Sequence, residues 1–175
     1  MVGEYWDENR NYKFDFSEAD KVFEVHEIAE EAGLNDVDFI LELKDTVLFL
    51  EYKNAIARAV TNPQAFIDKI LKPDKKAAFY KNIAKKFGDS LFILWSMREN
   101  EQDKEIKYVL LIEHPEIDGR IRKTLRNKIY KQLPFKLSKH KDVVRELISE
   151  FAVMNMEEWH EQYSMFPIQE IEEQI

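Results

Sequence analysis

The chain has 175 residues and no cysteine, so it is long enough for one hydrophobic core and excludes disulfides and thiolate zinc sites. An apolar fraction of 45% and an aromatic fraction of 13% exclude a disordered chain. The net charge is −8, the first residues lack an apolar signal segment, and no apolar run could span a bilayer. We therefore expect a single cytoplasmic domain over 1–175 with no membrane partner.

The charge is distributed unevenly along the chain. Residues 1–51 carry 4 basic and 15 acidic side chains, whereas residues 52–97 carry 9 and 3, and residues 120–145 carry 10 and 1. The two basic stretches can hold a nucleic-acid phosphate backbone in an otherwise acidic chain. The simpler alternative is that they are solvated faces of amphipathic helices.

The N-terminal third predicts a helix followed by a β-hairpin. The helix runs from Ser17, a favoured N-cap residue, to Ala32, and Gly33 ends it. The segments VDFILEL (37–43) and TVLFLEYK (46–53) have the composition of strands, and the two residues between the strands form a tight turn.

The middle of the chain predicts a broken helix and a buried strand. Asn62-Pro63 indicates a helix start, because proline is favoured at the first helical position. The helical pattern continues to Phe87 with a break at Pro73, and Gly88 is expected to end it. The nearly continuous apolar segment 91–97 is typical of a strand covered on both faces.

The remaining elements complete an α/β (α+β) fold. A strand is expected at 106–114, a basic helix from Pro115 to about Leu133, and a last amphipathic helix over 141–163. The order α-β-β-α-β-β-α-α then gives a mixed central sheet flanked by helices.

The predicted core spans 18–135, and residues 140–175 form an acidic amphipathic helical tail. The tail contains more apolar side chains than a peripheral helix needs, so it either closes the core or forms a homodimer contact. These side chains are Leu147, Ile148, Phe151, Met154, Trp159, Tyr163 and Phe166.

The hairpin brings three charged residues to one face. With a two-residue turn, opposed positions sum to 89, which pairs Asp38 with Glu51 and leaves Lys53 on the same face. Directly opposed carboxylates repel each other, and a divalent cation such as Mg²⁺ would compensate this repulsion. The backbone carbonyl of Tyr52 can add a ligand, and Lys53 can orient a water or stabilise charge on a phosphate.

The string DVDFILELKDTVLFLEYKNA resembles the catalytic core of the PD-(D/E)XK nuclease superfamily. An Asp followed 13 residues later by Glu-x-Lys on the adjacent strand, then a helix and an apolar strand, is similar to that core. The resemblance covers residues 18–97 and less clearly 98–135, and Val37 stands where the motif has its proline. It implies a restriction-endonuclease-like fold in which Asp38 and Glu51 hold Mg²⁺ or Mn²⁺, and Lys53 assists phosphodiester hydrolysis.

The Glu-x-Lys pattern alone is weak. Glu42-Leu43-Lys44 and Glu105-Ile106-Lys107 match it equally, and only Glu51-Tyr52-Lys53 has an Asp paired across a predicted hairpin. The alternative is an edge-strand salt bridge of Lys53 with Glu51 or Asp38.

The resemblance also implies a ligand on the first helix. In the RecB-like branch a His serves there, and His26 with Glu30 resembles its His-x-x-x-Glu pattern, whereas Glu27 matches the acidic residue of other relatives. Both His26 and Glu30 are expected beside the apolar face of the helix. The alternative is a boundary histidine with exposed glutamates.

Three residues are candidates for binding substrate. Gln64 resembles a glutamine that contacts substrate in the RecB-like branch, although Asp68 replaces the aromatic expected four residues later, and Gln64 can instead be an ordinary helix-start residue. Arg120 and Lys123 belong to a crowded basic helix that can hold DNA phosphates or simply be solvated.

The sequence therefore predicts a metal-dependent nuclease acting on nucleic acid, most readily DNA. One alternative is a catalytically inert binding or assembly module with the same fold. Another is an acidic interaction protein unrelated to nucleases, which predicts that Asp38 faces bulk solvent rather than a cleft.

Overall fold

The computed structural model describes residues 3–7, 10–54, 62–72 and 74–171. The strands are β1 (Glu4–Trp6), β2 (Tyr12–Asp15), β3 (Lys21–Phe23), β4 (Phe39–Glu42), β5 (Thr46–Asn54), β6 (Glu105–Glu113), β7 (Glu150–Met154) and β8 (Ile168–Glu170). The α-helices are α1 (His26–Ala32), α2 (Pro63–Leu71), α3 (Lys76–Ser96), α4 (Gly119–Tyr130) and α5 (Met156–Gln162), and a 3-10 helix covers Pro134–Lys139.

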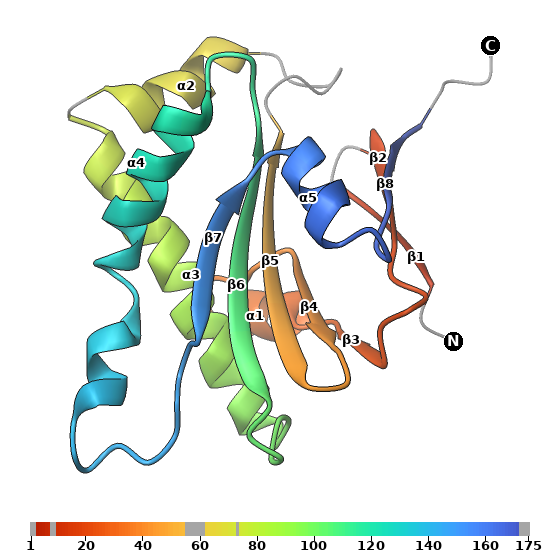
Figure 1. The fold of residues 1–175 in the computed structure, drawn as a ribbon, viewed down its shortest axis with the longest axis vertical. Helices are drawn as coiled ribbons and strands as arrows, with labels where there is room; N and C mark the ends of the chain where they lie inside the picture. The colour runs from red at the N-terminus through yellow and green to blue at the C-terminus, as the bar shows by residue number, and fades with distance from the viewer. Residues whose placement is uncertain (1–2, 8–9, 55–61, 73, 172–175) are drawn as a thin grey trace.

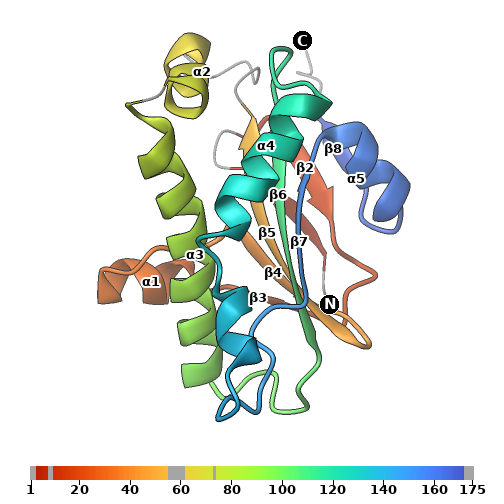
Figure 2. The same ribbon diagram turned by 60° about the vertical axis from the view of Figure 1, so that its left-hand side comes forward.

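A five-stranded mixed sheet forms the centre of the molecule, in the order β3-β4-β5-β6-β7 (Figure 1). The β3-β4-β5 pairs are antiparallel and the β5-β6-β7 pairs are parallel. Helices α1 to α4 lie on one side of this sheet, and α5 and a second sheet, β1-β2-β8, lie on the other (Figures 1 and 2). The expected mixed sheet flanked by helices is confirmed.

The hairpin of β4 and β5 has the predicted register. Ile40 pairs with Phe49 and Leu41 with Leu48, and the Leu43 N–H donates to the Thr46 carbonyl across the turn at 2.8 Å. Alternate residues enter different cores: Ile40 and Phe49 contact the helical layer, whereas Leu41 and Leu48 face the small sheet. Strand alternation therefore sets which charged residues face the helices.

Residues 17–25 do not form the first half of a helix as expected. Lys21, Val22 and Phe23 make strand β3, which pairs with β4, and only His26–Ala32 is helical. The apolar spacing in this segment fits both periods, and hydrogen bonding to the open edge of β4 favours the strand. Gly33 ends the helix as predicted, with a φ of 65°.

The prediction of a strand at 91–97 is wrong, because helix α3 continues through Gly88 to Ser96. The buried residues of α3 recur every three or four positions, as a helix packed along one face requires. They are Tyr80, Ile83, Phe87, Ser90, Leu91, Ile93 and Leu94. Glycine inside a helix costs about 1 kcal/mol relative to alanine, which this packing outweighs. In the described part of the chain, no helix is long and apolar enough to cross a membrane.

The helix starts and breaks are partly as predicted. The Asn62 side chain caps α2 by accepting from the Ala65 N–H at 3.0 Å, and α2 and α3 lie on either side of the expected break, whose residue 73 is outside the described ranges. The basic helix begins at Gly119 rather than Pro115, because Asp118 caps its first N–H groups, and it ends at Tyr130.

The prediction of one helix over 141–163 is also wrong. Residues 150–154 form β7, and α5 begins after Asn155, which makes a reciprocal capping box with Glu158. Trp159 and Phe166 are fully buried against the face of the central sheet that carries Leu48 and Leu50. The C-terminal segment therefore closes the core and is not a helical tail, and the side chains that suggested a dimer contact are used within the chain.

Candidate active site

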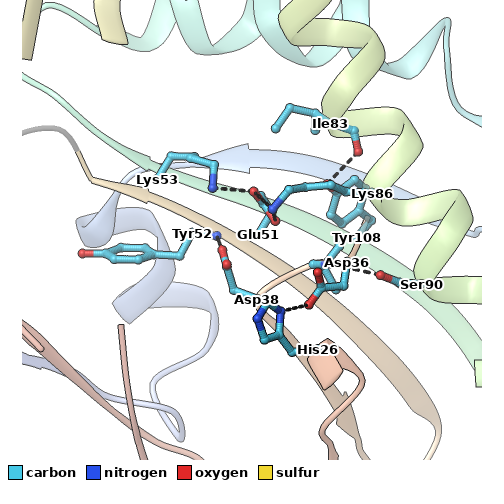
Figure 3. Close-up of polar contacts among 11 residues, drawn as sticks. His26, Asp36, Asp38, Glu51, Tyr52, Lys53, Ile83, Lys86, Ser90 and Tyr108 are labelled. Carbon is cyan, nitrogen blue, oxygen red and sulfur yellow. Dashed lines mark hydrogen bonds and ion pairs between the residues drawn. The ribbon is translucent and has the colours of Figure 1, made fainter. Parts of the chain in front are cut away.

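The candidate site lies where β5 extends beyond β4. Strand β4 pairs with β5 only as far as Leu50, so residues 51–54 of β5 have no β4 partner on that side. The Asp38 carboxylate takes the next position in the ladder and accepts a hydrogen bond from the Tyr52 N–H at 2.6 Å (Figure 3). Asp38 is thereby fixed beside the backbone between Glu51 and Lys53.

The Glu51 side chain is completely buried between two lysines. Its Oε1 lies 2.6 Å from the Lys53 ammonium and 2.8 Å from that of Lys86, which also donates to Oε2 at 3.0 Å (Figure 3). The lysine side chains are only 29% and 19% exposed. From the sequence, we expected a divalent cation to compensate the negative charge of Glu51. In the structure, two ammonium groups balance this charge.

Burial raises the pKa of Glu51 above its ordinary value. The negative charge of Asp38 raises this pKa further, while Lys53 and Lys86 lower it. Asp38 is thus close enough to Glu51 to influence its ionisation. Burial likewise raises the pKa of Tyr108 well above its usual range, so its hydroxyl stays neutral and donates to the Ile83 carbonyl at 3.0 Å.

Helix α3 organises the loop that carries Asp38 as well as the Glu51 pair. The buried Ser90 hydroxyl, four residues after Lys86, accepts from the Val37 N–H at 2.9 Å. One turn of this helix therefore fixes both sides of the candidate site.

His26 reaches the same region from the start of α1. Its Nδ1 lies 3.0 Å from Asp36 Oδ2, two residues before Asp38 (Figure 3). A carboxylate that holds one ring nitrogen of a histidine fixes the tautomer and orients the other nitrogen, as is usual behind metal-binding histidines. Asp36 was not singled out in the sequence.

Several of these residues line a cleft of about 320 Å³, whereas Glu51 and Lys86 do not. The lining residues are Trp6, Asp7, His26, Asp36, Asp38, Phe39, Tyr52, Lys53, Asn54 and Phe66. Tyr52 and Lys53 are consecutive and point to opposite faces, so the cleft runs across the unpaired edge of β5. Asp38 thus borders a cleft, and it is also exposed to solvent.

The other predicted residues lie elsewhere. Glu27 and Glu30 are exposed on α1 and do not line the cleft. Gln64 is exposed on α2, where its amide donates to Asp68 at 3.3 Å. Arg120 borders a separate groove between α4 and the α2–α3 pair, and Lys123 is exposed on α4.

The donor atoms present suit a hard cation. Within the described ranges, no three His, Asp or Glu side chains are close enough together to hold a metal ion. Mg²⁺, however, is commonly bound through one or two carboxylates and several waters. Asp38 and Glu51 supply that number, and the Tyr52 carbonyl points to the same edge as its N–H. Binding through Glu51 requires its carboxylate to exchange a lysine for the ion.

Lys86, like Asp36, is a site residue that was not predicted from the sequence. Ile83, Lys86, Phe87 and Ser90 share one face of α3, and the other three are buried in the core. A lone lysine among buried positions of an amphipathic helix signals a buried counter-charge. The sequence does not show which carboxylate this is, because only the packing of α3 on β5 brings Lys86 to Glu51.

Comparison of the chain with protein-family models, with curated proteins and with solved structures finds no match.

Proposed function

We propose that this chain is a metal-dependent nuclease of the PD-(D/E)XK type, with a restriction-endonuclease-like fold, which hydrolyses phosphodiester bonds in DNA. The observation that carries the proposal is the hydrogen bond from the Tyr52 N–H to Asp38. It holds the aspartate, which directly precedes β4, beside the β5 backbone between Glu51 and Lys53, and Asp38 and Lys53 line the cleft. A helical layer and the apolar parallel strand β6 follow, in the order that the motif requires.

Each residue then has a defined task. Asp38, Glu51 and the Tyr52 carbonyl would hold Mg²⁺ or Mn²⁺, which when bound supplies an activated water and a counter-charge for the phosphate. Lys53 stands two residues beyond Glu51 and can stabilise the charge that develops on the phosphate. His26, oriented by Asp36, lies at the mouth of the cleft and can contribute a further nitrogen ligand.

One observation favours a different function, that of a catalytically inert binding module. Glu51 already has two ammonium partners, so the Glu51–Lys53–Lys86 group can serve as a structural ion cluster. In that case the cleft binds a partner without chemistry, and added metal leaves the protein unchanged.

Thermal melting of the Glu51→Gln variant with and without Mn²⁺ separates the two functions. Metal-free Glu51→Gln leaves Lys53 and Lys86 without their shared carboxylate under either function, so the response to metal is the discriminating measurement. The nuclease predicts that Mn²⁺ stabilises the wild type by mass action and has little effect on the variant. A wild type whose melting temperature is indifferent to Mn²⁺ would contradict the nuclease.

The same proteins are then incubated with labelled single-stranded and double-stranded DNA and Mn²⁺. Asp38→Asn, Glu51→Gln and Lys53→Met should each lower cleavage by roughly 10²–10³-fold. The matched control is Glu105→Gln, which alters a second Glu-x-Lys sequence at the exposed start of β6 and should retain full activity.

A further inference from the structure

Trp6 is an exposed tryptophan at the candidate active site. It is 48% exposed at the end of β1, whereas Trp159 is completely buried. Trp6 belongs to neither hydrophobic core, yet it lines the cleft that contains Asp38 and Lys53. A tryptophan that lines a cleft, with its ring accessible, is suited to contact a ligand.

Three more aromatic side chains line this cleft: Phe39 from β4, Tyr52 from β5 and Phe66 from α2. Phe39 and Tyr52 are held in place by Phe14, with ring centroids 4.8 and 5.1 Å from its ring. The aromatic lining therefore combines a rigid part, fixed by the core, with the more exposed Trp6.

We propose, building on the nuclease function above, that the substrate is single-stranded nucleic acid and that Trp6 stacks on one of its bases. Inside a duplex both faces of each base are covered by its neighbours, so an aromatic ring in a cleft stacks most readily on the base of a single strand. A volume of about 320 Å³ is that of a small-ligand pocket and suits a single nucleotide.

The charges of the cleft set a condition on this binding. Asp7, Asp36 and Asp38 line it together with Lys53, so a phosphate backbone meets net negative charge there. Binding should consequently require a divalent cation, which distinguishes this cleft from a basic groove that holds phosphates directly.

The test measures binding of a fluorescent 12-nucleotide single strand and of the matching duplex in Ca²⁺, which takes the same oxygen ligands as Mg²⁺. Wild type should prefer the single strand, and Trp6→Ala should weaken that binding roughly tenfold or more. Trp6→Phe should retain most of the affinity, because it keeps a stacking face. Phe92→Ala is the matched control, since Phe92 is 63% exposed on α3 and does not line the cleft.

Two results would overturn the inference while leaving the nuclease function standing: equal binding and cleavage of the duplex, or a Trp6→Ala variant that binds the single strand normally. Absence of binding to either nucleic acid, with no cleavage, would remove the nuclease function itself. Because aromatic rings with carboxylates also suit quaternary ammonium groups, tetramethylammonium is tested as a ligand. Trp6-dependent binding of that ion without nucleic-acid binding would overturn both.

Discussion

Glu51 has the least favourable electrostatic position in the molecule's candidate site. A carboxylate with no solvent exposure stays ionised only if nearby cations offset the loss of hydration. Lys53 lies two residues after Glu51 on the same face of β5, and Lys86 comes from α3, which packs on that face. Lys53 is thus a local partner, supplied by the same strand, whereas the contact with Lys86 forms only when α3 packs on the sheet.

We expect Lys86→Met to destabilise the metal-free protein by about 1–3 kcal/mol at neutral pH, because the buried Glu51 loses one of its two ammonium partners. The loss of Lys86 raises the pKa of Glu51 further in the folded state. Below the ordinary value of 4.5, Glu51 is protonated in folded and unfolded chains, so the penalty vanishes, and it grows as the pH rises through the folded pKa. Urea unfolding as a function of pH measures this.

The adjacent Lys85 provides the control for that experiment. It forms an ion pair with Asp89 on the solvent side of α3, and its side chain is 49% exposed. Lys85→Met should change stability by less than about 1 kcal/mol. The double variant Lys86→Met with Glu51→Gln should recover much of the loss. If both lysine variants behave alike at every pH, Lys86 is not the counter-ion of Glu51.

Among the elements, the hairpin was predictable and the long helix was not. Both strands of the hairpin and their register follow from local alternation and a two-residue turn, which also placed Asp38, Glu51 and Lys53 at one end of the hairpin. Helix α3 depends on packing along its whole length, and a glycine at its centre hid that continuity. Lys86 and Asp36 were missed because only tertiary structure brings them to the site.

The glycines at the two helices give opposite predictions. Gly88 lies inside α3, where an added Cβ meets no atom within 4 Å, so Gly88→Ala should stabilise the protein by about 0.5–1 kcal/mol. Gly33 has a φ of +65°, so Gly33→Ala should destabilise it by about 1–2 kcal/mol. Denaturant melts of both variants measure this, and a loss of stability in Gly88→Ala would show that the helix is interrupted there.

At the scale of the whole molecule, two cores share the central sheet, and the C-terminal segment completes the second one. Trp159 stacks on Tyr163 with ring centroids 4.6 Å apart and donates its indole N–H to the Phe166 carbonyl at 2.8 Å. The sequence showed an apolar excess in this segment but not its destination, because a strand that joins a sheet edge is determined by that edge and not by local spacing.

Substitution of Trp6 and Trp159 distinguishes a cleft residue from a core residue. Trp159→Ala should cost about 3–5 kcal/mol, because it leaves a large cavity and an unpaired carbonyl. Trp6→Ala should cost about 1 kcal/mol or less, as expected for an exposed side chain. Equilibrium unfolding of the two variants under identical conditions provides the comparison, and equal losses would mean that Trp6 is part of the core.

The small sheet has a consequence for the order in which the chain folds. Strand β2 near the N-terminus pairs with β8, more than 150 positions later, so their contact closes a very long loop. The β1–β2 and β4–β5 pairs can form while the chain is still being synthesised, but β2 meets β8 only after residues 168–170 have emerged. The small sheet, which carries Trp6 on the cleft wall, is therefore completed last.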